Sequence, residues 1–166
     1  MKAIQYKDYG SSAVIELVEI PTPSIKSGKD IVVKVMATGV NPIDMKIRMG
    51  FMKETRPVKL PFIPGGEASG IIVEIGREVS KFKVGDEVIA LTKTSAYAQY
   101  VTINESFVLL KPQSLSFQEA ASVGVNIGTA QSVLFTEGKL EKGQKVLIQG
   151  VGGSVGVVSV HLATAH

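Results

Sequence analysis

The first 110 residues contain short runs in which β-branched or alternating apolar and polar residues predict strands. Turn-forming sequences such as SGKD, IPGG and VGDE separate these runs. Strands of this length and spacing favour a barrel or a sandwich over a parallel sheet. The predicted strands are Lys2–Tyr6, Ile15–Ile20, Ile31–Thr38, Ile71–Ile75, Glu87–Leu91, Tyr97–Ile103 and Phe107–Leu110.

A short helix is predicted within this β-rich part, over Pro42–Met49. Asn41 is a suitable cap for it, and proline suits the first helical position. The pattern becomes helical after residue 112. Ser116 and Glu119 form a capping-box pair that opens a helix through FQEAASV. A second helical stretch is predicted from about Ile127 to Thr136, closed by a glycine.

A compact apolar strand is predicted at Val146–Gln149, followed by the glycine-rich sequence GVGGSVG and an Ala/Val-rich helix. Glycines between a strand and a helix let a nucleotide diphosphate approach the backbone, while the helix N-terminus favours its charge. The strict G-x-G-x-x-G spacing is not met, because Val155 occupies the third glycine position. The spacing present is G-x-x-G-x-x-G. A simple tight turn is the alternative interpretation.

The nucleotide-binding unit that this pattern begins is incomplete. An acidic residue for the adenine ribose, or a basic one for a 2′-phosphate, is expected about 20 residues beyond the turn, but the chain continues for only ten residues after Gly156. A parallel sheet also needs a second strand after the crossover helix. We therefore expect the chain to be an N-terminal fragment of a longer protein, with residues 140–166 repacked, disordered or driving oligomerisation.

Composition narrows the range of functions. The chain has 166 residues, 45% of them hydrophobic, and contains no cysteine and two histidines. It therefore forms no disulfide and no thiolate metal site, which fits a reducing compartment. The start of the chain has no apolar run typical of a signal peptide, and no segment reaches the roughly 18 apolar residues of a membrane span. We expect a cytoplasmic protein without a membrane partner.

The chain has a net charge of +3 and contains one basic segment. This segment holds a single acid, Glu54, and a single aromatic residue, Phe51, and it matches no nucleic-acid-binding motif. A solvated loop or the rim of an anion-binding cleft therefore explains it better than a nucleic-acid partner. Its basic residues are Lys46, Arg48, Lys53, Arg56 and Lys59.

Several segments, in order, carry a resemblance to a known family. They are ATGVNPIDMKIRMG, PFIPGGEASGIIVEIG, VGDEV, SAYAQYV, SFQEAASVGVNIGTA and VLIQGVGGSVG. Together they resemble the N-terminal part of a zinc-independent medium-chain dehydrogenase/reductase of the quinone oxidoreductase, or zeta-crystallin, type. The resemblance implies a mainly β, GroES-like, partly open barrel as catalytic domain over residues 1–122. The first β-α unit of an incomplete, NAD(P)-binding Rossmann domain would follow over residues 123–166.

The resemblance also bears on zinc. Zinc-dependent relatives carry a cysteine at the position of Asn41 and a histidine at the position of Gly66, directly before Glu67. The two histidines of this chain, His161 and His166, lie instead in the last predicted helix. The resemblance therefore implies no metal, so that the chemistry rests on cofactor positioning and hydrogen bonds.

The activity implied is NADPH-dependent reduction of a quinone or an α,β-unsaturated carbonyl, in which hydride moves to an electron-poor carbon while donors stabilise the developing oxyanion. NADP is expected over NAD, and the parent protein is expected to be a homodimer. The fragment alone should bind dinucleotide weakly and turn over little. The alternative is a non-catalytic GroES-like module with a structural or interaction role.

Family patterns assign roles to individual residues. Asn41 would lie beside the nicotinamide and substrate, Asp44 would orient the same loop, and Thr129 would hydrogen-bond the carboxamide. Other interpretations stay open: Asn41 as only a helix cap, Asp44 as a surface or structural acid, and Thr129 as a residue bonded to its own helix. The diphosphate would be held by Gly150, Gly152, Gly153 and Gly156.

One position departs from the family pattern. Met52 stands where many relatives, including enoyl reductases, carry a proton-donating tyrosine. Solvent or a residue beyond the chain would then protonate the product. Met45, Met49 and Met52 form either a soft substrate wall or simple packing. Tyr97 and Tyr100 are expected in the core of a strand rather than as catalytic acids.

Overall fold

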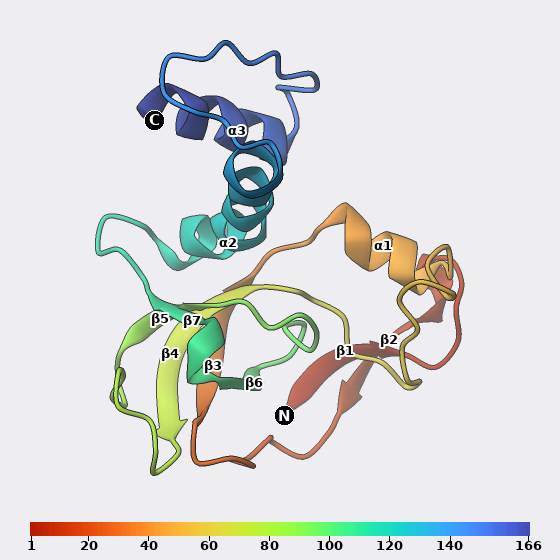
Figure 1. The fold of residues 1–166 in the computed structure, drawn as a ribbon. Coiled ribbons are helices and arrows are strands. Elements are labelled where there is room, and N and C mark those ends of the chain that lie inside the picture. Colours follow the sequence, from red (N-terminus) through yellow and green to blue (C-terminus); the bar gives the residue numbers. More distant parts are fainter. The chain divides into compact units, whose positions relative to one another are not determined.

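The computed structural model describes all 166 residues of the chain. The chain divides into two compact units, Met1–Ser122 and Val123–His166. Figure 1 shows a first unit built mainly of strands and a second built of helices and a long loop. None of the helices is both long and apolar enough to span a membrane.

The main sheet of the first unit has five antiparallel strands in the order β6-β3-β4-β5-β7 (Figure 1). Every neighbouring pair is antiparallel, so no crossover helix of the kind that joins parallel strands is needed. All strands predicted for this sheet are present. Their bounds are β3 Asp30–Thr38, β4 Ala68–Ile75, β5 Glu87–Ala90, β6 Tyr100–Asn104 and β7 Val108–Leu110.

The hydrophobic core of the first unit lies against this sheet. Strand β3 lies between β6 and β4, and its residues Ile31, Val32 and Val33 are all buried. Its register with β4 shifts at two places, Val32/Val33 and Val35/Ala37. Such bulges bend a strand and increase its twist, which allows a sheet to curve round a core. The core cluster consists of Ile31, Val33, Ile72, Val88, Ala90, Val101, Ile103 and Val108.

A second sheet contains two strands, β1 (Lys2–Tyr6) and β2 (Ile15–Glu19), joined by a short 3-10 turn. The two are antiparallel. Single bridges from β1, Ala3 to Ala98 and Tyr6 to Phe62, connect it to loops of the rest of the unit. The two sheets therefore leave an incompletely closed structure, and the prediction of a mainly β, partly open architecture is confirmed.

Helix α1 spans Pro42–Arg48 and ends one residue earlier than predicted. Asn41 is its N-cap residue, with proline at the first position. The predicted strand over residues 97–103 begins only at Tyr100, because residues 92–99 form a loop. Tyr97 therefore lies in a loop, and its placement in the core of a strand was wrong.

One continuous helix, α2 (Phe117–Gln131), replaces the two helical stretches that the sequence predicted. A π-helical turn, Ser132–Glu137, follows it directly. The capping box is confirmed, because Ser116 N donates to Glu119 Oε2 over 2.8 Å and Glu119 N donates to Ser116 Oγ over 3.2 Å. Gly128 does not interrupt the helix; glycine inside a helix costs only about 1 kcal/mol.

The second unit ends in helix α3 (Ser154–Ala165). The apolar segment Val146–Gln149 precedes the glycine turn as predicted, but it forms no strand. A strand needs a hydrogen-bonding neighbour, and no other strand lies in this unit. Leu147 is 85% exposed for the same reason. The order of an apolar segment, a glycine turn and a helix is otherwise that of a Rossmann β-α unit.

Candidate functional site

Asn41 lies in the first unit between β3 and α1, where its side chain meets a buried carboxylate. Its Nδ2 donates to Glu67 Oε1 over 2.8 Å, and Glu67 is only 1% exposed. An ionised carboxylate accepts hydrogen bonds and cannot donate them. The amide nitrogen of Asn41 therefore faces Glu67, while the capping box of α1 turns its amide oxygen toward the main-chain nitrogen of Asp44.

The chain before Asn41 passes very close to Glu67. A Cβ atom at Gly39 would overlap Glu67 Oε1 and would lie 2.7 Å from the carbonyl oxygen of Ala121, so only glycine fits there without a shift. Thr38 Oγ1 also donates to the main-chain oxygen of Glu67 over 2.8 Å. These contacts place the end of β3 and the start of β4 side by side at Asn41.

Asp44 connects the start of α1 to the loop at Tyr97. Its Oδ2 accepts from the main-chain nitrogen of Asn41 and from the hydroxyl of Tyr97, each over 2.9 Å. Asp44 is half-buried. The arrangement brings Asn41, Glu67, Asp44 and Tyr97 together in one hydrogen-bonded network.

Tyr97 is a permanent donor in this network. Burial raises the pKa of Tyr97 well above its usual range, and the hydrogen bond to Asp44 and the charges of Asp44 and Glu67 raise it further. The hydroxyl therefore keeps its proton at neutral pH. Its ring packs on Gly65, which has φ of +100° and whose Cβ would lie 2.5 Å from Tyr97 Cδ1. A backbone of this kind is readily adopted only by glycine.

Sequence reasoning gave no site role to Glu67 and dismissed Tyr97. A signal for Glu67 was present: it stands among small and apolar residues in PGGEASG, and a charged residue that is buried needs a specific partner. No comparable signal marks Tyr97, because only the fold brings it to Asp44.

The first unit contains no cysteine and no histidine. Nowhere in the chain do three His, Asp or Glu side chains gather as a metal centre requires. Asn41 and Gly66, the two positions that the resemblance assigns to zinc ligands in zinc-dependent relatives, contribute no thiolate and no imidazole.

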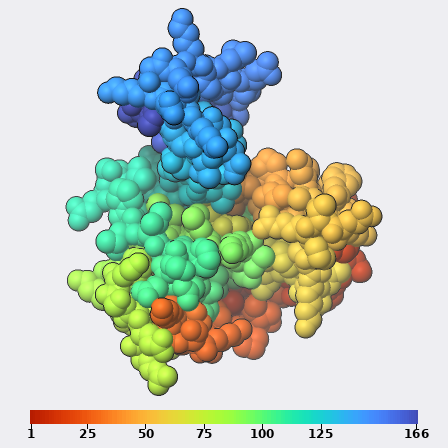
Figure 2. Space-filling model, in the orientation of Figure 1, coloured from red at the N-terminus to blue at the C-terminus, as the bar shows by residue number.

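The methionines and the basic segment lie on and after α1. Met45 and Met49 are 43% and 39% exposed, so neither is fully packed in the core. Arg48 donates to the main-chain oxygen of Gly10 over 2.6 Å. Figure 2 shows the orange and yellow residues of α1 and the following turn as a broad surface area of the first unit.

The predicted diphosphate-binding glycines form a tight turn in the second unit. Gly150 has φ of +76°, and Gly153 N donates back to Gly150 O over 3.0 Å. A Cβ at Gly156 would overlap Gly150 O, so glycine is needed where α3 crosses the turn. In contrast, a Cβ at Gly152 would meet nothing within 4 Å. The turn thus leaves open space at Gly152, which fits the approach of a diphosphate to the backbone.

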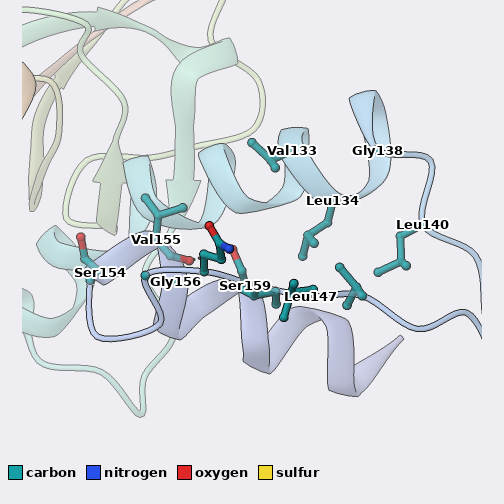
Figure 3. A pocket seen from close by; sticks show the side chains of 14 residues that line it. Val133, Leu134, Gly138, Leu140, Leu147, Ser154, Val155, Gly156 and Ser159 are labelled. Atoms are coloured by element: carbon teal, nitrogen blue, oxygen red, sulfur yellow. Dashed lines mark hydrogen bonds between the residues drawn. The ribbon is translucent and has the colours of Figure 1, made fainter.

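A cavity of about 570 Å³ adjoins this turn. Figure 3 shows Leu134, Leu147 and Ser159 around one space between the π-helical turn, the segment before the glycines and α3. The Ser159 hydroxyl donates to Val155 O over 2.7 Å, which satisfies it within its own helix. The lining is therefore largely apolar, with the glycine turn as its polar edge.

Thr129 is exposed on α2, and its hydroxyl donates to Val125 O over 2.7 Å. This is the helix-bonded state that the sequence left open. Thr129 does not line the cavity beside the glycine turn. Its oxygen still has a lone pair with which to accept a hydrogen bond.

Residues 27–113 match the alcohol dehydrogenase GroES-like domain family. Quinone oxidoreductase of Mus musculus is 32% identical over all of this chain and 50% of its own length. The 2-methylene-furan-3-one reductase of Solanum lycopersicum is 36% identical over 98% of this chain and 44% of its own length. The chain thus spans about half the length of these curated relatives.

Solved structures are similar to this chain over nearly its whole length and over about half of their own. The human synaptic vesicle membrane protein VAT-1 homolog-like protein is 33% identical, with a TM-score of 0.93 over 99% of this chain and 52% of its own. Escherichia coli quinone oxidoreductase complexed with NADPH is 28% identical, with a TM-score of 0.88 over 99% of this chain and 50% of its own. The fold expected from the resemblance, a GroES-like domain followed by the start of a Rossmann unit, is confirmed.

Proposed function

Because this chain belongs to the medium-chain dehydrogenase/reductase superfamily, in its quinone oxidoreductase group, we propose that it serves the NADPH-dependent reduction of a quinone or an α,β-unsaturated carbonyl. Residues 1–122 would form the catalytic domain and residues 123–166 would begin the nucleotide-binding domain. The observation that carries the proposal is the glycine turn before α3, with its open space at Gly152.

The turn has the chemistry that a dinucleotide diphosphate requires. The first N–H groups of α3 have no partner within the helix, and the helix dipole favours negative charge there. Missing side chains let phosphate oxygens reach the main chain. Gly150, Gly152, Gly153 and Gly156 would hold the diphosphate. NADP is preferred over NAD because the similar Escherichia coli enzyme is described as complexed with NADPH.

In the first unit, Asn41 would lie beside the nicotinamide and the substrate. When bound, the cofactor supplies a hydride to an electron-poor carbon of the substrate. Asn41 would orient these groups through its amide, and Asp44 would hold the main chain of Asn41 in place by the hydrogen bond already described. Thr129 would accept a hydrogen bond from the nicotinamide carboxamide while still donating to Val125 O.

The reaction would need no zinc. Charge developing on the substrate oxygen would be met by hydrogen-bond donors, since the side chains around Asn41 do not suit a zinc ion. Met52 has no proton to donate, so the proton that completes the product would come from solvent or from a residue outside this chain.

Titration of the whole protein with NADPH, followed by nicotinamide fluorescence, tests the proposal. Gly152→Ala should weaken binding by about tenfold or more, because its methyl group would fill the space meant for the diphosphate. Its melting temperature should stay unchanged, since nothing lies within 4 Å of the added atom. Gly128→Ala, a glycine in α2 with equally open surroundings, is the matched control.

The proposal would be overturned if the unmodified protein gave no fluorescence response at high micromolar NADPH. It would also be overturned if the Gly152→Ala variant bound NADPH as tightly as the unmodified protein. The second candidate, a non-catalytic module, is favoured by one observation: the first unit has a buried core of its own. That candidate predicts no response to NADPH and no reduction of any quinone.

A further inference from the structure

Asn41 has one contact beyond the capping box of α1. Its side-chain nitrogen donates to Glu67 Oε1 and its main-chain nitrogen donates to Asp44 Oδ2. The same Asp44 oxygen accepts from the hydroxyl of Tyr97. Side chains from the segment before β4 and from α1 therefore hold Asn41 directly, and the loop before β6 reaches it through Asp44.

The contact with Glu67 determines which way the amide of Asn41 points. An asparagine amide has a donor end and an acceptor end, and a 180° rotation exchanges them. A carboxylate accepts at both oxygens, so only the donor end is compatible with Glu67. A glutamine in place of Glu67 would offer both a donor and an acceptor. Either orientation of the Asn41 amide would then form a hydrogen bond with it.

The hydroxyl of Tyr97 donates to the same Asp44 oxygen that accepts from Asn41. The position of the Tyr97 ring is set by backbone packing, because it rests on Gly65 in a conformation with φ of +100°. The hydroxyl remains protonated at neutral pH, and it therefore donates continuously to Asp44. Asp44 in turn holds the main chain of Asn41 at the start of α1.

We propose that Glu67 and Tyr97 are positioning residues: Glu67 fixes which end of the Asn41 amide is presented to cofactor and substrate, and Tyr97 holds the Asn41 backbone through Asp44. This inference rests on the proposed function for the role of Asn41. It deepens that function by explaining how a metal-free site keeps one polar group in a single orientation. Loss of either residue should affect turnover more than folding.

The test compares Glu67→Gln and Tyr97→Phe in the whole protein with two controls. Glu54→Gln removes an exposed acid from the turn after α1, and Tyr100→Phe alters a partly buried tyrosine on β6. We expect kcat to fall by about tenfold in Glu67→Gln and by about threefold to tenfold in Tyr97→Phe, while both controls stay within twofold. The KM for quinone should change less than kcat.

A second readout does not need activity. In ¹⁵N NMR spectra, the side-chain amide signals of Asn41 should shift and broaden or double in Glu67→Gln, because two orientations are then populated. Tyr97→Phe should instead speed hydrogen exchange of the Asn41 main-chain amide, which donates to Asp44. Spectra of the two controls should leave both signals unchanged.

A reversed pair separates positioning from simple stability. Asn41→Asp combined with Glu67→Gln restores an amide–carboxylate hydrogen bond, but position 41 then presents a charged carboxylate oxygen in place of the neutral amide oxygen. The double variant should recover the melting temperature of the parent while its turnover stays low. It also keeps the test informative if Glu67→Gln alone does not fold, since it retains the polar pair.

Recovery of turnover together with stability in the reversed pair would overturn the inference, as would Glu67→Gln and Tyr97→Phe behaving like their controls in both readouts. Failure of the proposed function looks different. The unmodified protein would then neither bind NADPH nor reduce a quinone, while the NMR comparison would still report whether Glu67 orients Asn41.

Discussion

Tyr97 and Asp44 are 53 positions apart in the chain, and the Tyr97 hydroxyl donates to Asp44 Oδ2 over 2.9 Å. The hydrogen bond links the loop before β6 to the first turn of α1. Asp44 also accepts from the N-cap residue of that helix. A single carboxylate oxygen thus links the cap of α1 to a residue distant in sequence. A substitution at Tyr97 should therefore alter the hydrogen bonding at the first turn of α1.

Stability should fall at alkaline pH. Burial raises the pKa of Tyr6 to about 12 and, with the hydrogen bond to Asp44, raises that of Tyr97 still further from its usual range. An unfolded tyrosine ionises near pH 10, so above about pH 10 the unfolded chain loses protons that the folded chain keeps. The free energy of unfolding therefore falls as pH rises from 10 to 12, and below pH 10 this contribution is constant.

Urea unfolding at pH 8, 10 and 11 measures this effect. Tyr97→Phe should reduce the decrease above pH 10, because the group responsible is removed. Tyr6→Phe should do the same, and at pH 8 it should also be neutral or stabilising, since the buried Tyr6 hydroxyl has no hydrogen-bond partner. Equal slopes in all three proteins would contradict the assignment.

Two glycines should respond to alanine in opposite ways. A Cβ at Gly70 in β4 would overlap the main-chain oxygen of Lys34 and lie 2.8 Å from Val33 Cγ1. We expect Gly70→Ala to lower the free energy of unfolding by about 2–3 kcal/mol. Gly128→Ala should raise it by up to about 1 kcal/mol, because α2 has open space there and alanine favours helix. Chemical denaturation of both variants measures these changes in the free energy of unfolding. Changes of the same sign in both variants would refute the prediction.

Lys111 should matter more for stability than an exposed lysine. Its side chain is 5% exposed, and Nζ lies 3.0 Å from Glu87 Oε2. Nζ also donates to the main-chain oxygens of Pro112 and Leu115 over 3.2 and 2.5 Å. Lys111→Met should therefore cost about 1–3 kcal/mol, because the Glu87 carboxylate and the Leu115 carbonyl lose a charged donor that is held in place by burial.

Lys7→Met is the matched control for Lys111→Met. The ion pair of Lys7 with Glu16 is solvent-exposed, with side-chain exposures of 62% and 45%. Exposed pairs contribute at most about 1 kcal/mol. Thermal unfolding that gives similar losses for both variants would show that Lys111 is not a buried anchor.

The segment before the glycine turn should promote self-association of this chain. Leu147 is 85% exposed and Val146 is 44% exposed, and their backbone has no neighbouring strand. Exposed apolar residues on unpaired backbone favour pairing with another molecule. Light scattering should show a mass that rises with concentration and that falls with Leu147→Glu. Leu17→Glu, at a residue 66% exposed on paired β2, should have a smaller effect. A concentration-independent monomer would rule this out.

The strands were predictable because alternation of apolar and polar residues is a local property. In β3 the β-branched run Ile31–Val33 is buried and the following Lys34 is exposed, a pattern that is visible in the sequence. The same holds for α1, whose cap and first proline are adjacent residues. The glycines inside α2 misled the prediction, because packing of the helix outweighs the small local cost of glycine.

In the candidate site, too, some features could be predicted from the sequence and others depended on the tertiary structure. The glycine turn could be recognised from spacing alone, since Gly150 and Gly156 contact each other within one short segment. The roles of Glu67 and Tyr97 could not, because their partners are distant in sequence and are brought together only by sheet register and loop packing. Residue types and local spacing determined the elements, the family and the absence of thiolate ligands. The orientation of Asn41 and the unpaired state of Val146–Gln149 depended on which groups met in space, and hydrogen bonds between distant residues exist only once the chain has folded.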